Sequence, residues 1–198
     1  MKSKAEISIV VPLYNEAKNL KEFYSELDGV ISADGKDYEV IFVNDGSTDD
    51  SHKILLDIEE NANCVKVLSL KKNIGKAGAL ELGFKLVSGD IVVIMDCDLQ
   101  YDPRDIKSLL NKIDEGYDVV SGWRQNRWKG EFLTRRIPSV VANKIISSVG
   151  QMELHDHGCT LKAYRREVLL RLNLKGDMHR MIVVHAAYDG ARVAEVPV

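Results

Sequence analysis

Apolar residues follow two alternating patterns along the first half of this chain. Short apolar runs bounded by polar turns predict buried strands, and apolar residues repeated every three or four positions predict amphipathic helices. The runs predict strands at residues 7–13, 38–43, 65–70, 91–95 and 118–121, and the repeats predict helices around 20–30, 54–58, 77–87 and 106–113. Strands that alternate with helices favour an α/β fold: a mostly parallel central sheet with right-handed crossovers and helices on both faces.

Two of these helices begin with a capping signal. Ser47, with Asp50 three residues later, resembles a capping box that would open the second helix. Asp102 followed by Pro103 predicts an N-cap and a first helical residue for the fourth helix.

The alternation changes after Gly122. A helix is expected over residues 137–149, with Pro138 near its start. A strand at 159–164, helices at 165–172 and 178–188, and a strand at 193–198 are expected to follow.

The bulk composition narrows the class of protein. With 198 residues, 45% of them hydrophobic, we expect a single globular domain spanning residues 1–198. A net charge of −3 argues against a nucleic-acid-binding protein, which would be broadly basic. No apolar run approaches the roughly 20 residues that span a bilayer.

The cysteines and the ends of the chain indicate the cellular compartment that we expect for the protein. Three scattered cysteines with no C-x-x-C, and no secretory leader before the first strand, favour the reducing cytoplasm. Because the sequence stops on a strand, we expect it to belong to a longer parent protein that is anchored to a membrane.

The strongest chemical signal is the stretch 89–100. Its apolar run predicts a strand buried on both faces, and Asp96 and Asp98 follow at the carboxyl end, where open α/β sheets bind ligands. Two neighbouring carboxylates repel each other unless a hard cation or hydrogen-bond donors lie between them. We therefore expect Asp96 and Asp98 to hold Mg²⁺ or Mn²⁺ against a phosphorylated substrate; the alternative is a solvated acidic turn that caps the next helix.

Two other predicted strands also end in polar clusters, at residues 14–16 and 44–47. Right-handed crossovers bring the carboxyl ends of these strands to the same edge as Asp96 and Asp98. Alone, Asp45 is typical of a turn and Glu16 of a charge that complements a helix dipole. Their joint occurrence favours one site.

Two common phosphate-binding loops are excluded. A dinucleotide-binding G-x-G-x-x-G would have to lie between the first strand and helix, where residues 12–16 contain no glycine and one acid. A P-loop is excluded because Gly75-Lys76 lacks the upstream glycine and a following Ser or Thr. Phosphates would have to be neutralised by a metal and by cationic side chains.

Four motifs, V-P-x-Y-N-E, V-N-D-G-S, N-x-G-K-x-x-A and D-x-D-L-Q, together resemble the family 2 glycosyltransferases. S-G-W-R, R-R-I-P-S and D-H-G-C-T-L-K-A-Y-R resemble the polyprenyl-phosphate sugar transferases of that family. The resemblance spans nearly the whole chain. It implies the GT-A fold, a Rossmann-like sandwich, and metal-dependent transfer of a sugar from a UDP- or GDP-sugar to a polyprenyl phosphate such as dolichyl or undecaprenyl phosphate.

The resemblance also implies roles for matching residues. A nucleotide sugar would be bound by Pro12, Tyr14, Glu16, Val43, Asp45, Lys76, Asp96, Cys97, Asp98, Gln100 and Arg124. The metal ligands would be Asp96, Asp98 and Gln100, the acceptor phosphate would meet Arg135 and Ser139, and the catalytic group would be Asp98, Arg124, Arg135 and Asp156. Cys97 departs from the family, which usually has alanine there. The family also continues past its last E-x-P-V strand into a basic loop that helps close the active site.

The chemistry of the acceptor fits this assignment. A phosphate monoester has a second pKa of about 6, so it is already ionised at neutral pH and needs no strong general base. Asp156 would orient or deprotonate the acceptor, and in-line attack predicts inversion at the anomeric carbon.

Residues 123–136 hold five basic residues and one acid, with Trp128 and Phe132 interleaved. This segment fits either an anionic membrane surface or an ordinary solvated loop with two buried tryptophans. We expect a protein peripheral to, or anchored at, the inner face of the cytoplasmic membrane. Two alternatives remain: a family 2 transferase with a glycan or other acceptor, and a catalytically silent nucleotide-sugar-binding module.

Overall fold

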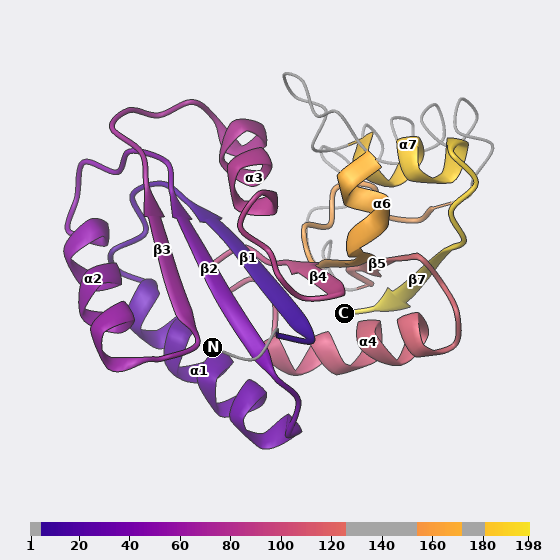
Figure 1. Ribbon diagram of the computed structural model, residues 1–198, viewed down its shortest axis with the longest axis horizontal. Helices are drawn as coiled ribbons and strands as arrows, with labels where there is room; N and C mark the ends of the chain where they lie inside the picture. The colour runs from indigo at the N-terminus through magenta and orange to yellow at the C-terminus, as the bar shows by residue number, and fades with distance from the viewer. Residues whose placement is uncertain (1–4, 126–153, 172–180) are drawn as a thin grey trace.

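A computed structural model describes residues 5–125, 154–171 and 181–198 of the chain (Figure 1). The strands of its seven-stranded sheet are β1 (Ile7–Leu13), β2 (Tyr38–Asn44), β3 (Val65–Ser69), β4 (Ile91–Ile94), β5 (Val119–Trp123), β6 (Lys162–Arg165) and β7 (Val193–Pro197). The described helices are α1 (Leu20–Asp34), α2 (Ser51–Asn61), α3 (Lys76–Phe84), α4 (Ile106–Asp114), α6 (Arg166–Arg171) and α7 (Ile182–Tyr188), with a 3-10 turn at Pro103–Asp105.

The strands lie in the order β3-β2-β1-β4-β6-β5-β7. Of these described strands, β6 alone is antiparallel to its neighbours, so the predicted mostly parallel sheet is confirmed. The simple succession of parallel strands is corrected at one point, because β6 separates β4 from β5. Its place depends on pairing with strands far away in the sequence, which local periodicity does not encode.

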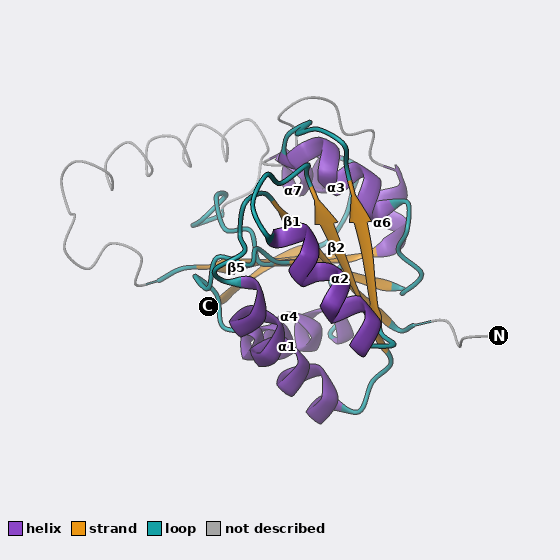
Figure 2. Cartoon of the chain, turned by 90° about the vertical axis from the view of Figure 1, so that its left-hand side faces the viewer, coloured by secondary structure: helices purple, strands orange, loops and turns teal. Residues whose placement is uncertain are grey.

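Helices cover both faces of the sheet, as predicted. The apolar sides of α1, α2 and α4 pack on one face and share a core that includes Ile9, Phe23 and Phe42. The other face carries α3, α6 and α7 over a second core that includes Val10, Leu80 and Tyr164. Figures 1 and 2 show the two helical layers on either side of the strands.

The direction of β6 matters for the site. Lys162, the first residue of β6, pairs with Ile94 near the end of β4 and with Ser121 in β5. The segment that precedes β6, residues 154–161, therefore lies at the same edge of the sheet as the carboxyl ends of β4 and β5.

Element boundaries match the predictions closely in the first half and less well in the second. The strand predicted at 159–164 begins only at Lys162, because the backbone N–H of Thr160 donates to the Tyr101 hydroxyl (3.1 Å) rather than to a neighbouring strand. The helix predicted at 178–188 is described from Ile182. The helix predicted at 137–149 and residue 172 of the helix predicted at 165–172 lie outside the described residues.

One capping prediction is confirmed and one is wrong. The Asp102 carboxylate accepts from the backbone N–H of Arg104 (2.9 Å), with Pro103 next in line. The second helix instead begins at Ser51, and the side chain of its N-cap residue, Asp50, makes no capping hydrogen bond. The Asp49 carboxylate accepts from the backbone N–H of Ser51 (3.0 Å). The hydroxyl of Ser47, expected to cap this helix, is used by the loop that follows β1.

Within the described parts of the chain, no helix is both long and apolar enough to cross a membrane.

Candidate functional site

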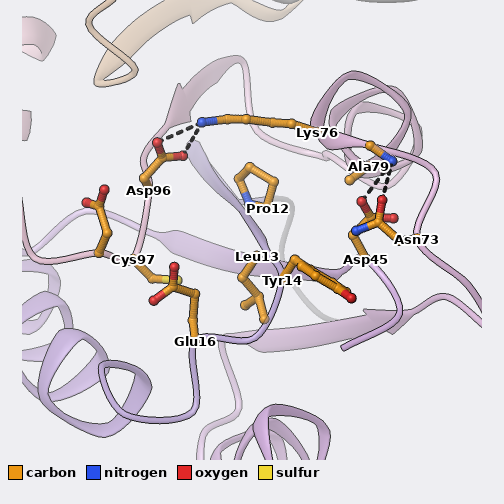
Figure 3. Close-up of a pocket in the computed structure, with 12 residues that line it drawn as sticks. Pro12, Leu13, Tyr14, Glu16, Asp45, Asn73, Lys76, Ala79, Asp96 and Cys97 are labelled. Atoms are coloured by element: carbon orange, nitrogen blue, oxygen red, sulfur yellow. Dashed lines mark hydrogen bonds and ion pairs between the residues drawn. The ribbon is translucent and has the colours of Figure 1, made fainter. Parts of the chain in front are cut away.

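The carboxyl ends of β1, β2 and β4 and the first turn of α3 surround one cavity of about 240 Å³ (Figure 3). It is lined by Pro12, Leu13, Tyr14, Glu16, Asp45, Asn73, Gly75, Lys76, Ala79, Asp96, Cys97 and Asp98. In Figure 3, Asp96, Cys97 and Glu16 lie on one side of Pro12, and Asp45 and Asn73 lie on the other. The predicted convergence of polar strand ends is therefore present.

The loops after β1 and β2 hold each other in place through hydrogen bonds. The backbone N–H of Asn15 donates to the Ser47 hydroxyl (2.9 Å), and that of Glu16 donates to the Ser51 hydroxyl (3.0 Å). The side-chain carbonyl of Asn15 accepts from the backbone N–H of Thr48 (2.8 Å). Asn15 has a φ of +58°, a conformation that asparagine tolerates better than most residues. These contacts fix the backbone that presents Tyr14 and Glu16 to the cavity.

Asp45 organises the opposite side of the cavity. Its buried carboxylate accepts from the backbone N–H groups of Ile74 (2.8 Å) and Gly75 (2.9 Å). The next residue, Gly46, has a φ of +70°, and a Cβ there would lie only 2.5 Å from the backbone carbon of Lys72. Asp45 and Gly46 thus bring the loop before α3 down onto the edge of the sheet.

Lys76, the first residue of α3, reaches across the cavity to Asp96. Its ammonium lies 2.6 and 2.7 Å from the two carboxylate oxygens of Asp96. Both side chains remain partly exposed. The ion pair therefore lines the cavity and is accessible to solvent, so another cation or an anion can compete for either partner.

Carboxylates gather around Cys97. Burial raises the pKa of the Cys97 thiol well above its usual range, and the charges of Glu16, Asp96 and Asp98 raise it further. A protonated, buried thiol is chemically inert, so Cys97 contributes volume and backbone. The carboxylates around Cys97 create a negative potential, which favours the binding of a cation.

The turn after β4 is strained. Leu99 has a φ of +60°, which is unusual for a bulky apolar side chain. In this turn the Asp98 carboxylate accepts from the backbone N–H of Gln100 (3.1 Å). Backbone strain of this kind is often stored at functional sites.

A second polar cluster lies at the end of β5. The Arg124 guanidinium donates to the two oxygens of Asp156 from Nε (2.7 Å) and Nη2 (3.1 Å), and it lies 5.8 Å from the centre of the Tyr101 ring. Burial lowers the pKa of Arg124, but the hydrogen bond and charge of Asp156 outweigh it and raise that pKa overall. The two side chains form a buried, bidentate ion pair.

The structure brings most of the predicted site residues together. Eight of them line the cavity: Pro12, Tyr14, Glu16, Asp45, Lys76, Asp96, Cys97 and Asp98. Val43 is buried in the core beside α3, and Gln100 is exposed; neither lines the cavity. Arg124 and Asp156 form their own pair, and Arg135 and Ser139 lie outside the described residues.

Four lining residues were not predicted as site residues: Leu13, Asn73, Gly75 and Ala79. Three of them belong to the N-x-G-K-x-x-A motif, from which only the lysine was chosen. The motif places Ala79 one turn after Lys76 on α3, so its small side chain also faces the cavity.

Comparison with known proteins identifies the family to which the chain is similar. The profile described as glycosyl transferase family 2 matches residues 8–172. An undecaprenyl-phosphate 4-deoxy-4-formamido-L-arabinose transferase from Enterobacter sp. (strain 638) is 37% identical over 194 residues, or 98% of this chain and 59% of the relative. A protein of the same description from Klebsiella pneumoniae is 36% identical over 195 residues, with the same coverage of both chains. The chain thus spans 59% of the length of these curated relatives.

Solved structures of glycosyltransferases share the GT-A fold with this chain. A mannosyltransferase from Pyrobaculum calidifontis in complex with GDP-Man and Mn²⁺ has a TM-score of 0.71 at 22% identity, over 99% of this chain and 56% of that chain. A glucosyl-3-phosphoglycerate synthase from Mycobacterium tuberculosis in complex with Mn²⁺, UDP and phosphoglyceric acid has a TM-score of 0.76 at 22% identity, over 98% and 68% of the two chains. At this identity the likeness shows the fold alone, and it confirms the predicted fold class.

Proposed function

Because the chain belongs to glycosyl transferase family 2, we propose that it transfers a sugar from a nucleoside diphosphate sugar to a polyprenyl phosphate. The proposal rests on one observation: Glu16, Asp45, Asp96, Asp98 and Lys76 converge on a single cavity at the carboxyl edge of the sheet. The description of the relatives as undecaprenyl-phosphate transferases supports a polyprenyl phosphate as the acceptor.

The cavity suits a nucleotide. Pro12, Ala79 and the exposed ring of Tyr14 offer apolar surface for a base, and Glu16 and Asp45 offer carboxylate acceptors for base or ribose N–H and O–H groups. A diphosphate beside so many carboxylates needs cations for neutralisation, and Lys76 supplies one of them.

Asp96 and Asp98 fit a divalent cation. They offer hard oxygen ligands of the kind that Mg²⁺ and Mn²⁺ prefer, and Gln100 supplies a further amide oxygen close by in sequence. Among the described residues, no group of three or more His, Cys, Asp or Glu side chains is placed to hold a metal by itself. We propose that diphosphate oxygens complete the ligand set, and the Mn²⁺ in complexes of structural relatives supports this. When bound, the metal would stabilise the negative charge that develops on the leaving diphosphate.

The protein side chains have separate tasks in this proposal. Lys76 exchanges Asp96 for a phosphate oxygen of the donor when the nucleotide enters. Arg124, together with Arg135 and Ser139, binds the acceptor phosphate, and Asp156 orients it. Because that phosphate is already ionised at neutral pH, it attacks the anomeric carbon directly from the face opposite the diphosphate, with inversion. A polyprenyl acceptor places this reaction at the inner face of the cytoplasmic membrane.

Turnover is the direct test. Radiolabelled UDP- and GDP-sugars are incubated with the protein, Mn²⁺ and undecaprenyl phosphate in detergent micelles, and label that moves into the organic phase is counted. A labelled lipid product supports the proposal. Transfer only to a glycan or another soluble acceptor would show that the acceptor is wrong, and nucleotide binding without any transfer would show a silent binding module.

The metal assignment is tested by calorimetry on Asp98→Asn. We expect affinity for the nucleoside diphosphate in Mn²⁺ to fall at least about tenfold, since one charged ligand is lost. Asp57→Asn, on the exposed side of α2, serves as the control. Unchanged affinity in Asp98→Asn would contradict the assignment.

A further inference from the structure

We infer that Glu195 is a positioning residue for the acceptor side of the site: it holds residues 155–158 so that Asp156 meets Arg124. The inference rests on the proposed function, because it gives this ion pair a task in the reaction. Glu195 does not line the cavity, and the sequence motifs give it no task.

The Glu195 side chain anchors the segment that carries Asp156. Glu195 lies on β7 opposite Ser121 of β5, and its side chain is only 10% exposed. One carboxylate oxygen accepts from the backbone N–H groups of His155 (3.0 Å) and Asp156 (3.2 Å). The other accepts from the N–H of His155 (2.9 Å) and lies 2.9 Å from Nδ1 of its ring.

Side chains, rather than a strand ladder, hold this segment. The ammonium of Lys162 donates to the carbonyl of His157 (3.2 Å), and the N–H of Gly158 donates to the carboxylate of Asp156 (3.1 Å). The His155 ring stacks on Trp123, with ring centres 4.2 Å apart. Regular pairing begins only at Lys162. The position of Asp156 therefore depends on a few specific contacts, to which Glu195 contributes several.

Glu195 lies on one strand, and Arg124 follows the neighbouring strand. Arg124 directly follows β5, and β5 pairs in parallel with β7, which carries Glu195. The sheet thus sets the distance between Glu195 and Arg124, and the segment bridges them. A bidentate Arg–carboxylate pair depends strongly on orientation, and an error of about 1 Å near a reacting group can slow a reaction about 100-fold.

The contacts of Glu195 distinguish this role from acid or base catalysis. Both of its oxygens already accept hydrogen bonds from His155 or Asp156, and it does not line the cavity. On this inference, the segment needs an acceptor at the right reach more than it needs a negative charge. Reach and charge can be separated by mutation.

The test compares three variants of the enzyme with undecaprenyl phosphate as acceptor. Glu195→Gln keeps the reach and an acceptor oxygen but loses the charge, and we expect kcat/KM for the acceptor within about threefold of the wild type. Glu195→Asp keeps the charge but is one methylene shorter, and Glu195→Ala has no acceptor; both should lose about 10- to 100-fold. Affinity for the nucleoside diphosphate with Mn²⁺ should stay unchanged in all three.

The opposite ranking overturns the inference. If Glu195→Asp is active and Glu195→Gln is not, the charge or the proton of Glu195 matters and its role is not positioning. Equal activity of all variants and the wild type also rejects it. Glu167→Ala, an exposed glutamate on α6, is the matched control and should leave activity unchanged.

Hydrogen exchange separates this inference from the proposed function. Amide exchange of residues 155–158 should be faster in Glu195→Asp than in Glu195→Gln, whether or not any lipid product forms. Failure of the wild type to make lipid product refutes the proposed function, whereas unchanged exchange at 155–158 refutes the anchor.

Discussion

At the scale of single residues, Lys76 occupies the position that a cation takes in the proposed reaction. Its ammonium contacts both oxygens of Asp96, so this carboxylate would have to release the ammonium before it could hold a metal ion. The same ammonium is then available to a phosphate group. In the proposed reaction, Lys76 would oppose the binding of a metal alone and favour the binding of a metal together with a diphosphate.

This double role gives a prediction for Lys76→Ala. Mn²⁺ without nucleotide should bind several-fold more tightly, because Asp96 no longer has to release an ammonium. The nucleoside diphosphate in saturating Mn²⁺ should bind about tenfold or more weakly, because a charge-assisted hydrogen bond of about 1.5–3 kcal/mol is lost. Isothermal titration calorimetry measures both. Lys85→Ala removes a lysine of the same region that pairs with exposed Glu81 and should change neither value.

Gly35 and Gly46 have nearly the same positive φ but different surroundings, so substitutions at the two positions distinguish the cost of backbone strain from the cost of close packing. Gly35 ends α1 at φ +74°, and a Cβ added there would have nothing within 4 Å among the described residues. Gly46 has a φ of +70°, and a Cβ added there would lie 2.5–2.8 Å from the backbone of Lys72 and Asn73.

We expect Gly35→Ala to lower the free energy of unfolding by about 1 kcal/mol, from the positive φ alone. Gly46→Ala should lower it by about 2–4 kcal/mol, because the loop before α3 must also move. Urea unfolding measures both values. Equal losses would show that this loop does not pack against Gly46.

At the scale of elements, a buried carboxylate fixes the edge of the sheet opposite the cavity. Glu39 of β2 accepts from the Ser8 hydroxyl of β1, from the Lys66 ammonium of β3 (2.6 Å), and from Ser88 before β4 (hydroxyl, 2.8 Å). Burial raises the pKa of Glu39, but the hydrogen bonds from Lys66, Ser8 and Ser88 outweigh it and lower the pKa to about 2. One side chain thus joins β1, β2 and β3 to the turn that precedes β4.

The lowered pKa predicts a pH dependence of stability. The folded-state pKa of Glu39 lies below its unfolded value, so its ionised form stabilises the fold fully above about pH 4.5, and this contribution is lost as the pH falls through about 2. Glu39→Gln should be about 2 kcal/mol or more less stable than the wild type at pH 7.

Urea unfolding at several pH values checks this, since the two stability curves should converge at acidic pH. Glu60→Gln on α2, at an exposed position, should run parallel to the wild type at every pH. A gap between the wild type and Glu39→Gln that stays constant down to about pH 2 would show that the charge of Glu39 does not stabilise the fold.

At the scale of the whole molecule, the two edges of the sheet carry different groups of polar residues. The carboxyl edge carries the cavity and the Arg124–Asp156 pair, and the amino edge carries the Glu39 network. The reversed strand β6 brings residues 154–161 to the carboxyl edge, so both candidate halves of the reaction lie on one side of the molecule.

This arrangement predicts where a ligand protects the chain. UDP with Mn²⁺ should slow amide exchange in residues 12–17, 44–51, 72–79 and 96–100, since binding stabilises the loops that surround the cavity. Exchange in α6 and around Glu39 should change little. Hydrogen exchange with mass spectrometry measures this, and protection centred on α6 would place the nucleotide elsewhere.

Most of the fold could be predicted from the sequence. Runs such as 7–13 and 91–95 carry the strand signal within themselves, because burial on both faces requires an unbroken apolar stretch. The order of polar strand ends, with the crossover rule, was enough to place Glu16, Asp45, Asp96 and Asp98 at one edge. Two errors fall where a hydrogen bond leaves its own element: the Ser47 hydroxyl serves the β1 loop rather than α2, and the Thr160 N–H uses Tyr101 rather than a strand.

The sequence by itself determined the alternation of strands and helices, the edge of the sheet at which the acidic residues lie, and the family to which the chain belongs. Only the tertiary structure decided that β6 runs between β4 and β5, that Lys76 pairs with Asp96, and that Glu195 anchors the segment carrying Asp156. The reason is physical. Periodicity and turn chemistry act over a few neighbouring residues. The Lys76–Asp96 and Asp156–Glu195 contacts join residues 20 and 39 positions apart, and the local sequence around one partner does not identify the other.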